Sequence, residues 1–129
     1  MKIIVCLDDN GGMLFNNRRQ SRDRVVYEDI INSLNGEKLF ISPFSQLLFE
    51  NYKDNICVCE DFLEKGNICF VENQSLSQYD ADEIIVYKWN RAYPADFYCD
   101  IDFSKCSLSE QTEFHGNSHE KITKQIFKR

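Results

Sequence analysis

The sequence lacks several features that define large protein classes. No apolar run approaches the roughly 18 residues that a membrane-spanning helix requires. There is no internal repeat, no low-complexity tract and no linker, and only two histidines are present. The apolar part of the N-terminal segment MKIIVCLDD is too short for a secretory signal and is typical of a first strand. We therefore expect one domain over residues 1–129, located in the cytoplasm and without a metal or a membrane partner.

Six cysteines are present, but their context argues against a disulfide scaffold. Cys6, Cys57, Cys59 and Cys69 lie in or beside apolar runs, where cysteine behaves as a small buried hydrophobe. Cys57 and Cys59 are one residue apart, whereas zinc and redox motifs typically have two residues between their cysteines. We expect buried free thiols.

Apolar periodicity predicts alternating strands and helices. The predicted strands cover 2–7, 38–41, 55–59, 67–72, 83–89 and 106–114, and the predicted helices cover 23–34, 42–52 and 61–65. Residues 119–128 fit either a helix capped by Ser118 or a strand of a terminal hairpin. This alternation indicates an α/β fold with a mixed, largely parallel sheet flanked by helices.

A polar loop and four arginines follow the first strand. In open α/β sheets, ligands bind beyond the carboxyl ends of the strands. The candidate ligand loop therefore comprises Asp8, Asp9, Arg18, Arg19 and Asp23. Two interpretations stay open for the arginines Arg18, Arg19, Arg22 and Arg24. In the first, the arginines bind a phosphate or carboxylate group of a ligand. In the second, they form ion pairs within the protein, with Asp8, Asp9, Glu28 and Asp29.

Negative charge is concentrated in the second half of the chain. Residues 51–110 hold twelve acidic and five basic side chains, in a chain whose net charge is −6. Such a field repels nucleic acid and attracts basic partners. Aromatic side chains, which interface hot spots favour, lie between these acids. The candidate partner-binding residues are Asp80, Asp82, Glu83, Tyr93, Asp96, Asp100 and Asp102.

The two histidines, His115 and His119, are four residues apart. On one helix face they would suit metal ligation or acid–base chemistry. Gly116 and Asn117 between them favour a turn, which would spoil that spacing. We expect structural or surface histidines.

The order of these segments resembles dihydrofolate reductase-like domains. The first strand, the acidic loop, the helix and EKLFISPFSQLLFE are similar to the first third of that family. ADEIIVYKWNRAYPADFYCDIDF is similar to its late strand and acidic loop, and TEFHGNSHEKITKQIF to its final β-hairpin. The resemblance implies a shortened version of this fold that lacks one strand–helix unit, and a strand near the C-terminus.

Two departures from that family's pattern affect the cofactor site. The family binds cofactor phosphates with a Gly-Gly turn, where this chain has Glu72 and Asn73, and a carboxylate repels pyrophosphate. The family's Arg-Thr element is replaced by the sequence Ser42-Pro43-Phe44-Ser45. Asp23 matches the family's acidic proton-relay residue, although an acid there also suits a helix N-terminus. We expect no nicotinamide cofactor.

Two further resemblances bear on function. The N-terminal segment DDNGGMLFNNRRQ is similar to small bacterial proteins that often carry a ribonuclease Z label, but a chain with two histidines lacks that enzyme's metal motif. In size, charge and composition the chain resembles immunity proteins of contact-dependent inhibition systems. This resemblance implies binding and neutralisation of a basic toxin domain, most simply a nuclease. The alternative is a small enzyme or nucleotide-binding protein that uses the 8–24 loop.

Overall fold

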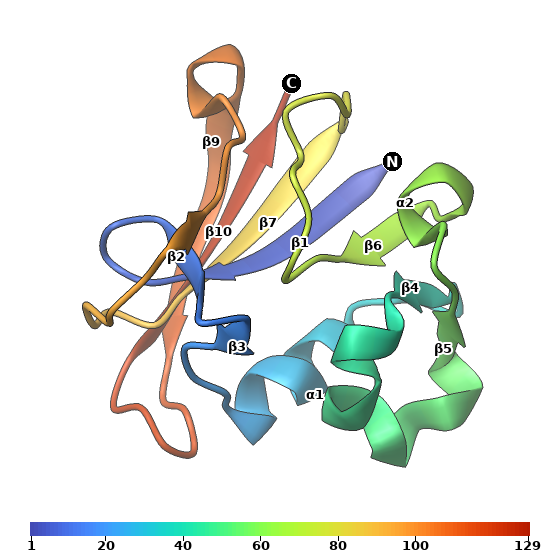
Figure 1. Ribbon diagram of the computed structural model, residues 1–129, viewed down its shortest axis with the longest axis horizontal. Helices are drawn as coiled ribbons and strands as arrows, with labels where there is room; N and C mark the ends of the chain where they lie inside the picture. The colour runs from blue at the N-terminus through green and yellow to red at the C-terminus, as the bar shows by residue number, and fades with distance from the viewer.

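The computed structural model describes residues 1–129 and contains two β-sheets (Figure 1). The larger sheet has seven strands, and a small three-stranded antiparallel sheet packs against one of its faces. Across the larger sheet the strands are β5 (Ile56–Val58), β4 (Leu39–Ile41), β6 (Ile68–Phe70), β1 (Lys2–Leu7), β7 (Glu83–Lys88), β10 (Ile122–Lys128) and β9 (Ser107–Phe114). The small sheet consists of β3 (Arg18–Arg19), β2 (Gly12–Phe15) and β8 (Phe97–Tyr98).

The first five strands of the larger sheet are parallel, and β10 and β9 complete it in antiparallel orientation. The predicted α/β fold with a mixed, largely parallel sheet is therefore confirmed. The C-terminal segment is a hairpin strand and not a helix, because β10 pairs with both β7 and β9. Ile122 and Ile126 of this strand contact the same hydrophobic core. No helix lies in the connection between β6 and β7.

Two α-helices and two 3₁₀ segments complete the fold: α1 (Arg24–Asn32), α2 (Phe62–Lys65), η1 (Pro43–Asn55) and η2 (Phe103–Lys105). Asp23 caps α1 by accepting the Val25 N–H. The predicted second helix is a kinked 3₁₀ segment, with non-helical backbone angles at Phe49 and Tyr52. No helix is long and apolar enough to cross a bilayer.

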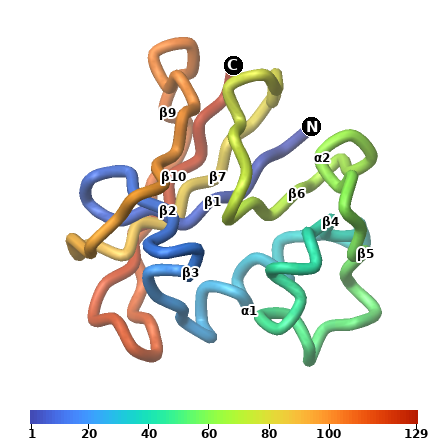
Figure 2. The backbone as a smooth tube through the Cα atoms, viewed as in Figure 1, coloured from blue at the N-terminus to red at the C-terminus, as the bar shows by residue number.

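The sheet separates two hydrophobic cores. Successive residues of β1 alternate between them, so that Ile4 packs under α1 and η1 while Ile3 and Val5 face the small sheet and α2. Figure 2 shows the chain passing between these layers, with both termini at the same end of the sheet. The sequence did not predict the small sheet, which carries part of the candidate ligand loop.

All six cysteines are free thiols, and Cys69 is the only one that is buried. The expectation of buried thiols is therefore wrong for Cys6, Cys57 and Cys59, which are half-buried by residue exposure. Burial nevertheless raises the pKa of the Cys6 thiol well above its ordinary value.

Candidate functional site

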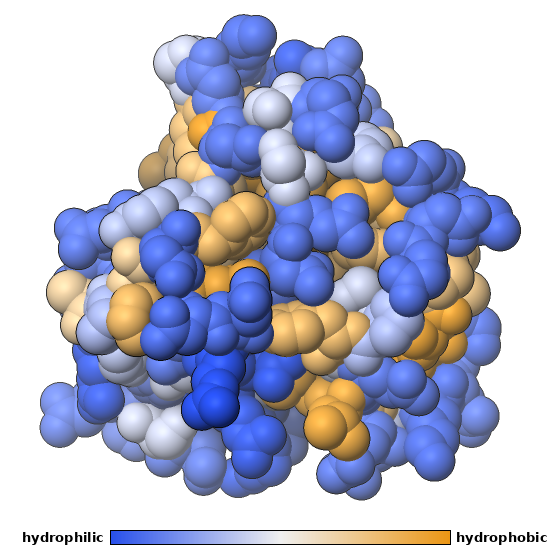
Figure 3. All heavy atoms as spheres, viewed as in Figure 1, coloured by the Kyte–Doolittle hydropathy of each residue, from blue (hydrophilic) through white to orange (hydrophobic).

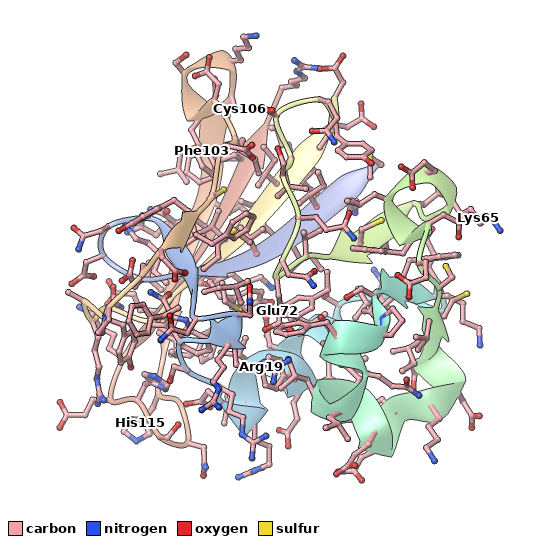
Figure 4. All side chains as sticks on the ribbon, viewed as in Figure 1. Arg19, Lys65, Glu72, Phe103, Cys106 and His115 are labelled. Atoms are coloured by element: carbon pink, nitrogen blue, oxygen red, sulfur yellow. The ribbon has the colours of Figure 1, made fainter.

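The centre of the candidate ligand loop is an ion pair between Arg19 and Glu72. The Arg19 guanidinium donates two hydrogen bonds to the Glu72 carboxylate, at 2.9 and 3.0 Å, and a third to the Phe44 carbonyl. Ser45 donates a hydroxyl hydrogen bond of 2.8 Å to the same carboxylate. Arg19 and Glu72 meet in the middle of the molecule, between β3 and the region above α1 (Figure 4). The pair therefore ties β3 to the segment after β6.

Asp8 organises the loop after β1 through hydrogen bonds and not through an arginine. Its buried carboxylate accepts backbone N–H groups of Asn10, Gly12 and Tyr93 and the side-chain amide of Gln20. Burial by itself raises the pKa of Asp8, but these hydrogen bonds outweigh it and lower the pKa below its usual value. Both oxygens of the Asp8 carboxylate are thus used internally. Asp9 is exposed and forms no ion pair.

The interpretation that the four arginines form ion pairs with nearby acids holds only for Glu28. None of the arginines pairs with Asp8, Asp9 or Asp29. Arg24 pairs with Glu28 one helical turn away, at 2.8 Å. Asp29 pairs instead with Lys124 of β10 and accepts the Tyr87 hydroxyl. Arg18 and Arg22 have no ion pair, and both are exposed.

Asp23 and His119 form a second, fully enclosed contact, a hydrogen bond in which Nδ1 of His119 lies 2.9 Å from the Asp23 carboxylate. The Asp23 carboxylate also accepts the backbone N–H groups of Val25, Asn117 and Ser118. Burial raises the pKa of Asp23, but these hydrogen bonds and that of His119 lower it to about 2. The β9–β10 loop therefore covers the acid that begins α1.

The other side of the His119 ring faces hydroxyl groups. Its Nε2 lies 3.0 Å from the Ser21 Oγ and 3.3 Å from the Tyr93 hydroxyl. The Trp89 indole stacks on the ring, with centroids 4.7 Å apart and planes 23° apart. His119 is thus held by Trp89 on one face and by polar partners at both nitrogens. His115 directly follows β9, at the start of the same loop, and is exposed at the lower left of Figure 4.

No protein-family model matches the sequence, and no curated protein sequence does. Among solved structures, the dihydrofolate reductase of Enterococcus faecalis, complexed with NADP(H) and RAB-propyl, matches with a TM-score of 0.70. The match covers 99% of this chain and 95% of that chain at 9% sequence identity. The chain has a dihydrofolate reductase-like fold. At this identity the likeness establishes the fold alone, and the expected architecture is confirmed.

Two concave surfaces lie near these residues of the dihydrofolate reductase-like fold. A groove of about 530 Å³ runs between α1 and η1, and the exposed Leu47 and the side chains of Arg22 and Arg24 line it. A second groove, of about 510 Å³, lies at the β2–β3 hairpin and is lined by Phe15, Asn16, Arg18, Arg19, Gln20, Tyr93 and Pro94. No cluster of three metal-ligating side chains is present, and neither His115 nor His119 joins one.

The seven candidate partner-binding residues do not form one surface. Asp80, Asp82 and Glu83 lie at the start of β7, whereas Tyr93 and Asp96 follow its other end, roughly 20 Å away across a six-residue strand. The first three are paired with the cationic chain ends. Asp80 pairs with Arg129, Asp82 with the N-terminal ammonium, and Glu83 with Lys2.

Asp100 and Asp102 have local structural roles. Asp100 accepts the Leu76 N–H and the Ser75 hydroxyl, and Asp102 caps η2 through the Ser104 N–H. Hydrogen bonds from Ser104 lower the pKa of Asp102. Neither residue forms an ion pair, so each keeps its negative charge at the surface.

Sequence reasoning included Tyr98 among the aromatics that lie between the acids, but it missed Phe15, the exposed aromatic of β2. The pairing of Leu14 with Phe97 turns both side chains inward, so the next residues, Phe15 and Asp96, face solvent opposite one another. Phe15 and Tyr98 are 42% and 50% exposed. Figure 3 shows that most of the visible surface is hydrophilic, with isolated apolar patches. The alternation of exposed and inward-facing residues in DFY was the signal that could have revealed this face.

Proposed function

We propose that the protein is a binding protein that neutralises a basic protein partner, as immunity proteins neutralise toxin domains. The observation that carries this proposal is the outer face of the small sheet. There Phe15 and Tyr98 are exposed beside the Asp96 carboxylate, which has no cationic partner. Exposed aromatics next to a charge are typical of interface hot spots.

The state of the reductase-like cleft supports binding over reductase chemistry. Glu72 takes the position at which the family has its Gly-Gly turn, and Arg19 and Ser45 hold it there. A negative side chain at that place disfavours a pyrophosphate group. Asp23, which matches the family's acid, is closed off by Asn117, Ser118 and His119.

The charge distribution favours the Asp96 half of the predicted surface. An acid that is already paired with Lys2, Arg129 or the N-terminus attracts an incoming cation less strongly than an unpaired acid does. We therefore assign Tyr93 and Asp96 to the partner-binding face, and give Asp80, Asp82 and Glu83 a supporting electrostatic role at the other end of the sheet.

The test is a growth-rescue and binding assay with the toxin domain encoded beside this gene. We expect Asp96→Lys combined with Tyr98→Ala to weaken binding at least tenfold and to abolish rescue. The matched control is Asp80→Lys combined with Tyr79→Ala, which also changes one acid and one tyrosine. Equal effects of both pairs would reject the assigned face. The absence of any basic partner among neighbouring gene products would reject the function.

A second candidate function is binding of a small anion in the groove between α1 and η1. Its volume of about 530 Å³ falls within the range typical of ligand pockets, and Arg22 at its rim has no ion pair. Thermal shift with NADPH, folates and nucleotides tests it. A stabilisation that Arg22→Ala removes would favour this function over partner binding.

A further inference from the structure

Ser21, His119 and Asp23 form a continuous chain of hydrogen bonds across three side chains. The Ser21 Oγ lies 3.0 Å from Nε2 of His119, and Nδ1 of the same ring lies 2.9 Å from the Asp23 carboxylate. We propose that Ser21 is an activated nucleophile that short-chain carboxylic esters acylate, with His119 as its base and Asp23 as the residue that orients the base. This proposal is independent of the partner-binding function.

The hydrogen bonds around Asp23 fix the protonation of the ring. An ionised carboxylate only accepts hydrogen bonds, and Asp23 receives three backbone N–H groups that favour its ionised form. Nδ1 of His119 therefore carries the proton that faces Asp23. In the neutral ring Nε2 is then the acceptor, and it faces the Ser21 hydroxyl. This is the arrangement that a serine nucleophile requires of its base.

The ring is also held in place by packing. His119 is 3% exposed, and Trp89 stacks on it at 4.7 Å. Gly116 allows the loop to approach, because a Cβ at this position would lie 2.5 Å from the Asp23 Oδ2. The stacking of Trp89 and the hydrogen bond to Asp23 together keep the His119 imidazole in one orientation toward Ser21.

The groove at the β2–β3 hairpin provides access. Ser21 itself lines a cavity of about 10 Å³, and Arg19 and Gln20 line both this cavity and the neighbouring groove of about 510 Å³. A cavity of this size holds about one water molecule, so the groove must supply the space for both the acyl group and the leaving group, which favours the smallest acyl groups. This limits the substrate class to short acyl esters. The Tyr93 hydroxyl, which lines the groove 3.3 Å from Nε2, is the donor available to a developing oxyanion.

The reaction balances without a cofactor. The Ser21 oxygen forms a bond to the acyl carbon while its proton passes to Nε2 of His119, and the ester C–O bond breaks as that proton passes to the leaving alcohol. Water then attacks the acyl-serine and gives a proton to Nε2, which returns it to the Ser21 oxygen. The products are the carboxylic acid, the alcohol and the unmodified protein.

The first test uses the wild-type protein and so does not depend on how variants fold. Folded protein is incubated with methanesulfonyl fluoride, a small serine-directed reagent, and the modified residue is located by peptide mass spectrometry. We expect one methanesulfonylated site, Ser21, and no modification after unfolding in denaturant. An unmodified Ser21 in folded protein would overturn the proposal, as would equal modification of exposed serines such as Ser109.

The second test is hydrolysis of p-nitrophenyl acetate. Ser21→Ala and His119→Asn should reduce the rate to that of buffer, and Tyr93→Phe should reduce it by roughly 10²-fold. The control Ser109→Ala, in the exposed strand β9, should leave the rate unchanged. If Ser21→Ala hydrolyses the ester as fast as wild type does, the serine is only structural. Ser21→Ala and His119→Asn lie outside the assigned partner-binding face, so their results are distinguishable from a failure of partner binding, which is measured separately.

Discussion

The Arg19 guanidinium is bound to the Glu72 carboxylate by two hydrogen bonds, and the two residues are 53 positions apart in the chain. Their side chains are only 23% and 10% exposed. The Phe44 ring lies 4.8 Å from the guanidinium carbon and covers its face. The pair thus joins three segments that meet only in the folded protein: β3, the start of η1 and the segment after β6.

We expect Glu72→Gln to lower the free energy of unfolding by about 2 kcal/mol, because it leaves a partly buried guanidinium without its counter-charge. Urea unfolding followed by fluorescence measures this loss. The control is Glu28→Gln, which breaks the exposed pair with Arg24 and should cost about 0.5 kcal/mol or less. Similar losses in both variants would contradict the role given to Arg19 and Glu72.

The Asp23 carboxylate makes stability depend on pH in the acid range. Its pKa is about 2 in the folded protein, against an ordinary value of 3.8. Its contribution, about 2 kcal/mol, is therefore present above pH 4 and is lost as the pH falls toward 2. Asp23→Asn should be less stable at pH 7, and its deficit relative to wild type should shrink between pH 4 and pH 2.

Urea unfolding at each pH gives that difference. The control is Asp9→Asn, which removes an exposed carboxylate without an ion pair from the neighbouring loop. A deficit of Asp23→Asn that stays constant from pH 7 to pH 2 would show that the amide, and not the charge, accounts for the loss.

The strands of the larger sheet could be predicted from the sequence because they are continuous apolar runs. Residues 83–89, for example, fold as β7 with four buried residues in succession. The small sheet could not be predicted in the same way, because its strands are two to four residues long. Its local signal was Asn16-Asn17, two residues with φ of 51° and 61° that form the hairpin turn.

The candidate site was only partly predictable for a different reason. Asp23 was identifiable as an acid at the start of a helix, but its partner His119 is 96 positions away. Arg19 was assigned to nearby aspartates, whereas its partner lies after β6, which the parallel order of the sheet places next to β1. Periodicity gives the elements, and the pairing of distant side chains depends on how those elements are ordered in space.

Thiol reactivity should follow burial. Desolvation raises the pKa of Cys69 to about 11 and that of the half-buried Cys99 and Cys59 above the ordinary value. Iodoacetamide at pH 8 reacts with thiolates, so we expect Cys69 in folded protein to react at least tenfold more slowly than Cys106. Peptide mass spectrometry over a time course measures both rates in one sample. Equal rates would mean that the region around β6 opens readily.

Gly116 should be essential to the loop that covers Asp23. Its backbone φ is ordinary, so its importance comes from space: an added Cβ would lie 2.5 Å from Asp23 Oδ2 and 3.0 Å from the His119 carbonyl oxygen. Gly116→Ala must therefore displace the loop from the start of α1. We expect a loss of about 2 kcal/mol in unfolding free energy, because the Asp23 carboxylate loses donors while it stays buried.

The matched control is Asn117→Ala in the same loop. It removes only an exposed side chain, whose contact with Arg24 is 3.3 Å long, and it keeps the backbone N–H that Asp23 accepts. Its loss should stay within about 0.5 kcal/mol. In Gly116→Ala the fluorescence of Trp89, the only tryptophan, should also change, because His119 stacks on its indole. A Gly116→Ala protein with the stability and the fluorescence of wild type would contradict the close approach between the loop and α1.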